Sequence, residues 1–343
     1  MNIILDLLNE DYATKYLSKK LLWLYPDFLE ISEVKIIPHK KLIWDTTYHV
    51  VIEFDTTFVL KNKRTKKLSI FCSAHSNEPR LDFYKALKFL WQNGFGKGDL
   101  SIPHPLFFSK RFNALFYRGV SGKNLYYYIK KNDRAEIESI IAKAAFWFAK
   151  LHKLKTYGHL IFNEPNSRIE TVLPGMKHIL ARVANDYPQC VGTFSAIYET
   201  INKQEKDFLS STSKRWLIHG DAHPENIIRM SKDKIGVIDF SDFCSSDFAR
   251  DLGSFIQQIG YMANRKIGDL AYTKKLQKLF LDSYLKNAKI KINDGLQNRI
   301  DNYYNWTTMR TATHFLIKDG PEPERALPLI KEVADRLNIK YQF

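Results

Sequence analysis

The sequence predicts an α+β protein with two lobes, a small sheet-rich N-terminal lobe and a larger helical C-terminal lobe. Its 343 residues suggest two domains or one two-lobed body, because a domain usually spans about 100–200 residues. β-Branched and aromatic residues concentrate between residues 34 and 71, whereas nearly everything after residue 123 has helical character. The exception in the second part is residues 216–251, where short strands and loops are expected.

The first part reads as helix, then strands, then helix. Residues 1–30 carry apolar side chains at helical spacing and predict a helical extension. The segments 48–54 and 68–71 predict two strands, and the basic run 61–67 between them predicts a solvated hairpin tip. A helix is predicted over residues 81–93, ending at Gly94 and Gly96, and a further strand over residues 114–117.

The composition is that of a globular protein with a large positive charge. Hydrophobic residues make up 45% of the chain and charged residues 26%, with only 15 Gly and 12 Pro, which excludes collagen-like and low-complexity chains. The 52 Lys and Arg residues outnumber the 37 Asp and Glu residues and give a formal net charge of +15. This charge either reflects a lysine-rich surface or favours anionic partners such as nucleotides and phosphorylated metabolites. A nucleic-acid-binding role rests on charge alone, because no clear nucleic-acid motif accompanies it.

The cysteines and the N-terminus predict a cytoplasmic protein. Cys72, Cys190 and Cys244 lie far apart and form no C-x-x-C pair, which argues against a disulfide framework or a cysteine zinc site. The first residues lack the basic region and cleavage site of a signal peptide. No window of about 18 uncharged apolar residues occurs, so no transmembrane segment is expected.

The segment that carries chemistry is residues 216–239. An apolar strand leads into His219, Gly220 and Asp221, Asn226 follows five residues later, and a second strand ends at Asp239. Phosphoryl transfer from ATP needs a carboxylate facing the acceptor hydroxyl and oxygen ligands for Mg²⁺ near the same point. A loop with Asp and Asn, followed by a hairpin that returns with another Asp, supplies these groups.

This arrangement resembles the aminoglycoside phosphotransferase and choline kinase family, relatives of the protein kinases. That family has H-G-D-x-x-x-x-N followed by a strand ending I-D, which here is His219 to Asn226 and then Ile238-Asp239. Three more motifs fit in the family's order, so the resemblance covers about residues 45–260. They are Y-R-G-V-S-G at 117–122, F-A-K-L-H-K-L at 148–154 and S-D-F-A-R-D-L-G at 246–253.

The resemblance implies a protein-kinase-like fold and a role for each matching residue. Asp221 would orient or deprotonate the acceptor hydroxyl, and Asn226 and Asp239 would hold Mg²⁺ against the ATP phosphates. Asp251 would brace the catalytic loop, inside which His219 would pack and hydrogen-bond. The backbone of the hinge would meet the adenine; its residues are Arg118, Gly119 and Val120.

The N-terminal lobe departs from the family pattern. The strand at 68–73 places Phe71 or Cys72 where the family has a lysine that contacts the ATP phosphates, and the phosphate-covering loop, residues 41–48, has no glycine. We therefore expect a phosphate clamp built from other groups, such as His75 or Arg80, with Lys66 and Lys67 as the next candidates.

Two histidines and two aspartates near the motifs have less specific interpretations. His223 is expected to be a satisfied loop histidine rather than a metal ligand, and His152 a core histidine. Asp242 and Asp247 are either loop caps or carboxylates that face the substrate.

The sequence thus predicts a small-molecule kinase that uses ATP and Mg²⁺ to phosphorylate a hydroxyl group. The N-terminal lobe would span residues 1–117 and the C-terminal lobe residues 118–343, whose last helices (270–288, 297–318 and 323–337) would wall the acceptor site. The alternative is a pseudokinase, a nucleotide-binding or scaffolding protein without turnover, which the missing lysine favours. A polycationic acceptor would need an acidic pocket, for which Asp301, Glu322 and Glu324 are the candidates; otherwise the acceptor is anionic or neutral.

Overall fold

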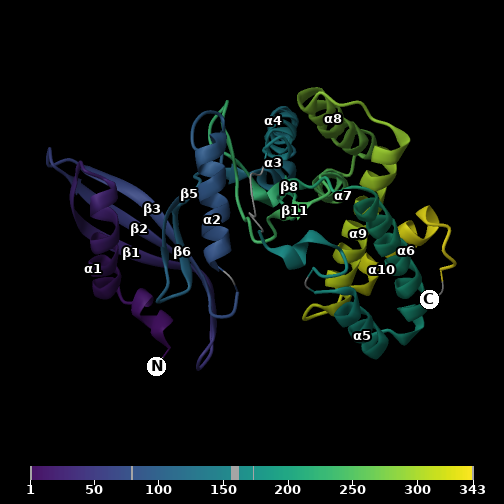
Figure 1. Cartoon of the computed structure of the whole chain (residues 1–343), viewed down its shortest axis with the longest axis horizontal. Coiled ribbons are helices and arrows are strands. Elements are labelled where there is room, and N and C mark those ends of the chain that lie inside the picture. Colours follow the sequence, from purple (N-terminus) through teal and green to yellow (C-terminus); the bar gives the residue numbers. More distant parts are fainter. Residues whose placement is uncertain (1, 79, 156–161, 173, 342–343) are drawn as a thin grey trace. The chain divides into compact units, whose positions relative to one another are not determined.

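The computed structural model describes residues 2–78, 80–155, 162–172 and 174–341, which belong to two compact units (Figure 1). The first unit comprises Met1–Gly122 together with Met230–Ile238, and the second comprises Lys123–Arg229 and Asp239–Phe343. The sequence analysis placed the division between residues 117 and 118 and did not assign residues 230–238 to the first unit.

The first unit is built on a five-stranded antiparallel sheet with strand order β1-β2-β3-β6-β5. A short parallel pair, β4 with β10, belongs to a separate sheet. The strands are β1 (Phe28–Ile43), β2 (Tyr48–Leu60), β3 (Thr65–His75), β4 (Leu100–Ser101), β5 (His104–Ser109), β6 (Ala114–Arg118) and β10 (Ile235–Val237). Its helices are the 3-10 turns Ile3–Leu8 and Leu22–Leu24, α1 (Glu10–Leu21), α2 (Arg80–Leu90) and the π turn Trp91–Phe95.

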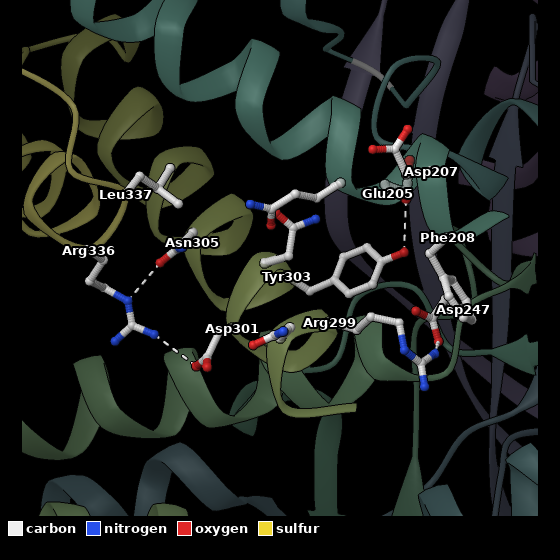
Figure 2. A pocket seen from close by; sticks show the side chains of 13 residues that line it. Glu205, Asp207, Phe208, Asp247, Arg299, Asp301, Tyr303, Asn305, Arg336 and Leu337 are labelled. Atoms are coloured by element: carbon white, nitrogen blue, oxygen red, sulfur yellow. Dashed lines mark hydrogen bonds and ion pairs between the residues drawn. The ribbon is translucent and has the colours of Figure 1, made fainter. Parts of the chain in front are cut away.

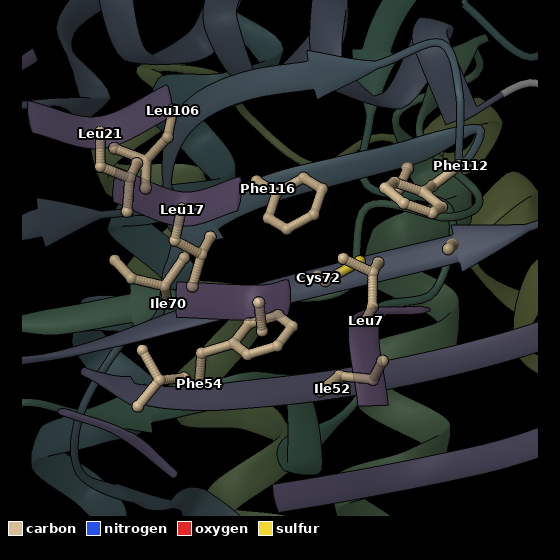
Figure 3. Packing of buried hydrophobic residues seen from close by; sticks show 14 of the residues in the cluster. Leu7, Leu17, Leu21, Ile52, Phe54, Ile70, Cys72, Leu106, Phe112 and Phe116 are labelled. Atoms are coloured by element: carbon tan, nitrogen blue, oxygen red, sulfur yellow. The ribbon is translucent and has the colours of Figure 1, made fainter. Parts of the chain in front are cut away.

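Helix α1 covers one face of this sheet. Along β2, buried and half-buried residues alternate, so Ile52 and Phe54 face one side while Glu53 faces the other. Leu17 and Leu21 of α1 pack on the buried face in one hydrophobic cluster (Figure 3). The N-terminal helix is therefore part of the core of the first unit.

The first strand begins earlier than the sequence predicted. The helical segment ends at Leu24 and β1 starts at Phe28, so the prediction of helix up to residue 30 was wrong for its last residues. Most of β1 is exposed because it lies at the edge of the sheet, which leaves little of the alternation that identifies a strand.

The expected phosphate-covering loop is the turn between β1 and β2, at residues 44–47. It needs no glycine because none of its residues has a positive φ, and the side chain of Asn2 stabilises it. The Asn2 amide donates to the backbone oxygens of Trp44 (3.0 Å) and Thr47 (3.1 Å), and the turn is closed by a hydrogen bond from Trp44 N to Thr47 O (2.9 Å).

The second unit is mainly helical (Figure 1). Its helices are α3 (Leu125–Lys131), α4 (Arg134–His152), α5 (Met176–Asp186), α6 (Val191–Ser211), α7 (Ala249–Ile267), α8 (Leu270–Ala288), α9 (Asp294–Ile317) and α10 (Pro323–Arg336). Its short strands are β7 (Lys123–Asn124), β8 (Trp216–Ile218), β9 (Ile227–Arg229) and β11 (Cys244–Ser246). Strand β7 pairs with β9 and β8 with β11, both antiparallel. Among the described residues, no helix combines the length and the apolar character needed to cross a membrane.

The three C-terminal helices lie close to their predicted bounds, and capping residues mark the starts of α8 and α9. Asp269 accepts a hydrogen bond from the backbone N of Tyr272 (2.9 Å), so α8 begins at Leu270 as predicted. Asn293 caps α9 through the backbone N of Leu296 (2.9 Å), and this helix starts three residues earlier than predicted, at Asp294.

We predict that Leu17→Ala destabilises the protein by about 2–5 kcal/mol, because Leu17 is fully buried under the sheet and its truncation leaves a cavity. Urea unfolding followed by far-UV circular dichroism measures the change. Lys19→Ala on the exposed side of the same helix is the control and should shift stability by less than about 0.5 kcal/mol. Equal effects of the two substitutions would show that α1 is not part of the core.

Candidate active site

The loop that carries Asp221 begins at a glycine that no other residue can replace without strain. Strand β8 delivers the chain to His219, which is fully buried, and Gly220 then adopts a left-handed φ of +83°. A Cβ atom at Gly220 would lie 2.2 Å from the backbone oxygen of Asp242. Both the conformation and the close approach therefore require glycine at this turn.

Asp251, in the first turn of α7, holds this loop through its carboxylate. One oxygen accepts from the backbone N of Gly220 (2.9 Å), and the other accepts from the backbone N of His219 (2.7 Å) and from His152 Nε2 (3.0 Å). The second ring nitrogen of His152 contacts the hydroxyl of Tyr284 (2.9 Å), so α4, α7 and α8 are linked to the loop. Burial raises the pKa of Asp251, but the contacts with His152 and His219 outweigh this effect and the pKa lies below its usual value.

Asp221 and Asn226 lie side by side. The Asn226 amide donates to the backbone oxygen of Asp221 (3.0 Å) and to its carboxylate (3.3 Å). His223 Nε2 lies 3.2 Å from the same carboxylate. The side chain of Asp221 is 44% exposed, although it stands in a recess with protein on several sides. Burial in this recess raises the pKa of Asp221, but His223, His219 and Arg310 together hold it well below its usual value.

Asp239 belongs to the same unit and leaves one carboxylate oxygen available. It has a left-handed φ of +61°, and its Oδ1 accepts from the backbone N (3.3 Å) and the hydroxyl (2.8 Å) of Ser241. Within the described part of the chain, neither Asp239 Oδ2 nor Asn226 Oδ1 has a hydrogen-bond partner. Two such oxygens are the donor type that Mg²⁺ prefers.

The donor set is too small for a metal cage made of protein alone. Over the residues that the structure describes, no group of three or more His, Cys, Asp or Glu side chains is arranged to hold a metal ion. Mg²⁺ in nucleotide sites is usually bound by one or two protein ligands together with phosphate oxygens and water, so Asn226 and Asp239 fit such an ion.

A pocket of about 530 Å³ opens at Asp221 within the second unit. Helices α7, α9 and α10 supply most of its wall, including Arg265, Trp306 and Arg310. The sequence analysis assigned the last three helices to this wall; this was wrong for α8, which contributes no described residue to it, and α7 takes its place. The sequence analysis also missed Arg265, Trp306 and Arg310. Their spacing shows that Trp306 and Arg310 share one face of a helix, but it does not show which face turns toward the catalytic loop.

The acidic residues considered for this pocket lie elsewhere. Asp301 pairs with Arg336 (2.9 Å), Glu322 pairs with Lys318 and Arg325, and Glu324 lines a different pocket. None of the three lines the pocket at Asp221. The acidic acceptor pocket that a polycation would need is therefore not formed by these residues.

The sequence analysis left open whether Asp242 and Asp247 are loop caps or carboxylates that face the substrate, and the structure gives a different answer for each. Asp242 lines the pocket with Asp221 and accepts from the side chain of Asn166 (2.8 Å); burial and the nearby Asp221 raise its pKa. Asp247 is fully buried, accepts from the backbone N of Ala249 (3.1 Å) and pairs with Arg299, so it is a cap at the start of α7.

In the first unit, the hinge residues line a separate cavity of about 390 Å³. Arg118, Gly119 and Val120 all contribute to it. A Cβ atom on Gly119 would lie 2.3 Å from the ring of Phe71, which stacks on Tyr117 with 5.5 Å between ring centroids. Phe71 and not the fully buried Cys72 therefore occupies the open face of β3 where the family has its lysine.

His75 and Arg80 come together at the other end of β3, around Glu78. The Arg80 guanidinium lies 2.9 Å from one Glu78 oxygen, and His75 lies 3.3 Å from the other. Burial lowers the pKa of His75, and burial with nearby positive charges lowers that of His49, beside Arg80, to about 4. At neutral pH the positive charge of this cluster is therefore that of Arg80.

We predict that Asp251→Ala destabilises the protein by about 3–5 kcal/mol, because it leaves two backbone N–H groups and His152 without an acceptor in the core. Urea unfolding at pH 7 measures the loss. Asp207→Ala removes an exposed aspartate that pairs with Lys203 on the surface and should change stability by less than about 1 kcal/mol. A loss in Asp251→Ala no larger than this control would contradict the bracing role.

The same brace predicts a pH dependence. Because the pKa of Asp251 is lowered in the folded protein, its stabilising effect is complete above the unfolded value of about 3.9 and is lost as the pH falls further. The stability difference between wild type and Asp251→Asn should therefore be constant from pH 7 to pH 5 and shrink below pH ~4. A difference that grows on acidification would contradict the assignment.

Comparison with known proteins identifies the fold. Ethanolamine kinase from Plasmodium vivax is 14% identical, with 95% of this chain and 89% of that chain covered and a TM-score of 0.55. APH(2″)-IIa in its ternary complex with streptomycin and ATP is 14% identical, covering 94% and 95%, with a TM-score of 0.53. Spectinomycin phosphotransferase APH(9)-Ia with ADP and spectinomycin is 13% identical, covering 95% and 94%, with a TM-score of 0.53. At these identities the similarity shows the fold, and it confirms the predicted protein-kinase-like class.

The family follows from the sequence itself. No curated protein gives a significant sequence match. The model of the phosphotransferase enzyme family, however, matches residues 44–281, well over half of the chain and including every motif from residue 117 to residue 253. This match confirms the resemblance that the motifs indicated. The chain therefore belongs to the phosphotransferase enzyme family.

Proposed function

We propose that this protein is a kinase that transfers the γ-phosphoryl group of ATP to a hydroxyl group of a small molecule. The observation that carries the proposal is the Asp221 carboxylate, which stands at the floor of an open pocket beside Asn226 on a loop braced by Asp251. A carboxylate in such a place can receive an acceptor hydroxyl, and the pocket volume of about 530 Å³ suits a small molecule.

In the proposed reaction Asp221 accepts a hydrogen bond from the acceptor hydroxyl and aims its oxygen at the γ-phosphorus. The new O–P bond forms as the bond from the γ-phosphorus to the bridging oxygen breaks, ADP leaves, and the hydroxyl proton passes to the carboxylate. Because the pKa of Asp221 is held low, its main task is to orient the hydroxyl, which suits the loose transition state of phosphoryl transfer.

Asn226 and Asp239 are proposed to hold Mg²⁺ through their available oxygens. A bound Mg²⁺ neutralises charge on the phosphates of the nucleotide. Beside this, the interaction of Asn226 with Asp221 keeps the carboxylate in one orientation, and the hydrogen bonds from Ser241 do the same for Asp239.

The nucleotide is proposed to use the hinge and the cluster at the end of β3. The backbone of Arg118, Gly119 and Val120 would meet the adenine edge. Arg80, with His75 beside it, would take over the contact with the phosphates, and Glu78 would hold both groups in place, as a glutamate does for the family's lysine.

Phe71 in place of that lysine favours the second candidate, a pseudokinase that binds nucleotide without turnover. Against it stands the complete set of Asp221, Asn226 and Asp239, since a protein without turnover has no need of a carboxylate facing an open acceptor pocket. The two candidates differ in phosphoryl transfer and not in nucleotide binding.

Removal of the metal tests the proposed ligands. We expect ATP to bind at least ~10-fold more weakly in EDTA than in Mg²⁺, since the metal bridges protein oxygens and phosphates. Asp239→Ala should bind Mg·ATP as weakly as the wild type does in EDTA, whereas Asp233→Ala, in the exposed turn before β10, should bind normally. Isothermal titration calorimetry measures each affinity. Equal affinities with and without Mg²⁺ would exclude the assignment of Asn226 and Asp239.

Substitution of Asp221 tests the reaction. Asp221→Asn keeps the size of the side chain and removes its charge, so we expect normal folding and Mg·ATP binding but a kcat lowered by about 10²–10⁴-fold. An ADP-release assay with a panel of hydroxylated metabolites measures kcat once an acceptor is found, with Asp233→Asn as the control. Near-normal turnover in Asp221→Asn would contradict the mechanism. A wild type that binds Mg·ATP but phosphorylates no acceptor would support the pseudokinase.

A further inference from the structure

In the pocket at Asp221, the acidic side chains and the arginines come from different elements of the structure. The catalytic loop and the segment after it contribute the carboxylates of Asp221, Glu225 and Asp242, together with His223, which pairs with Asp221. The α-helices contribute arginines and a histidine: Arg265, Arg310, His314 and Arg325. Among the residues that the structure describes, no α-helix places an acidic side chain in this wall.

Two of these arginines have no partner for their charge. Arg310 of α9 is half-buried, and its guanidinium lies 5.1 Å from the ring of Trp306. It makes no ion pair and no hydrogen bond within the described ranges, and its Nη1 is buried. Arg265 of α7 is exposed and likewise has no ionic or hydrogen-bond partner in the part of the chain that the structure describes. An unpaired surface arginine is ordinary, but a half-buried one is costly unless something else supplies an acceptor.

Other arginines of the same unit are paired within the protein. Arg325, on the same wall, contacts Glu322 and the hydroxyl of Tyr261. A second pocket, of about 680 Å³, is equally polar, but Figure 2 shows its arginines turned to carboxylates, Arg299 to Asp247 and Arg336 to Asp301. The arginines of that second pocket are thus paired within the protein, whereas Arg265 and Arg310 in the pocket at Asp221 are not.

Arg310 also acts on nearby carboxylates through its positive charge. It helps to lower the pKa of Asp221, and it partly offsets the rise in the pKa of Asp242. That influence does not satisfy its hydrogen-bond donors, because neither carboxylate forms an ion pair with it. This electrostatic effect also gives Arg265 no partner. Arg265 lies one turn after Tyr261 on α7, whereas Arg310 belongs to α9.

We infer that the acceptor of this kinase is a small alcohol that also carries an anionic group, a carboxylate or a phosphate, which Arg265 and Arg310 bind while the hydroxyl meets Asp221. The inference rests on the proposed kinase function and adds the class of acceptor. A guanidinium group offers paired donors that match both anions. A cationic acceptor would instead place its charge among two free arginines.

Binding of matched compounds tests this class. The first set is glucose, glucosamine, glucuronate and glucose 6-phosphate, and the second is glycerol, 2-amino-1,3-propanediol, glycerate and glycerol 3-phosphate. Each set holds the skeleton constant and varies the charge. Calorimetry with the full-length protein in the presence of Mg·ADP should show that an anionic member binds at least ~10-fold more tightly than its neutral and cationic counterparts. The carboxylate and phosphate arms show which anion is preferred.

Three variants locate the effect. Arg265→Gln and Arg310→Lys should each reduce the preference for the anionic over the neutral compound about 10-fold. Arg310→Lys keeps the charge that acts on Asp221 and loses only the paired donors, so it separates anion binding from the electrostatic role. Lys266→Gln removes one charge from the neighbouring residue, which does not line the pocket, and should keep the wild-type preference.

Three results would overturn the inference: tighter binding of the cationic members, no binding of any anionic member at millimolar concentration, or a wild-type preference in Arg265→Gln and Arg310→Lys. The kinase proposal has a separate readout, ADP release that depends on Asp221. Phosphorylation of a cationic alcohol would overturn the inference and leave the kinase standing. Arginine-dependent binding of an anionic alcohol without phosphoryl transfer would overturn the kinase and leave an anion-binding pocket.

Discussion

The carboxylate of Asp251 is the point on which the candidate active site depends. It is buried, yet both of its oxygens have donors, and these come from the catalytic loop and from α4. A buried charge is tolerated only when such hydrogen bonds offset the loss of water. The same bonds place the backbone of His219 and Gly220, and therefore determine where Asp221 points. Asp221 is therefore positioned by a helix that begins 28 residues later in the chain.

Charge acts in two different ways in the second unit. Most arginines that line its pockets form ion pairs inside the protein, as Arg299 does with Asp247, and these pairs hold helices together. Arg265 and Arg310 are different because they have no ion-pair or hydrogen-bond partner among the described residues. The net charge of +15 left open whether the protein has a lysine-rich surface or binds anionic partners. The anion site that we infer lies beside Asp221.

The first unit has the sheet of a protein-kinase-like fold, but the face of β3 near the hinge carries Phe71 where the family has a lysine. Phe71 lies against Gly119 of the hinge. Arg80, at the start of α2, is the residue proposed to contact the phosphates instead. Helix α1 covers the opposite face of the sheet, and Asn2 stabilises the turn between β1 and β2. The unit therefore keeps the sheet while changing the side chains that are proposed to meet the nucleotide.

The sequence by itself determined the features that depend on near neighbours. Gly220, Asp221 and Asn226 sit within seven residues, and local caps such as Asp269 mark where helices begin, so these motifs and helices could be predicted. It did not determine the early start of β1, an exposed edge strand, or the wall of the acceptor pocket, where Arg265 and Arg310 come from different helices. Those depend on which faces pack together across long stretches of chain, and spacing along one helix cannot show which face turns inward.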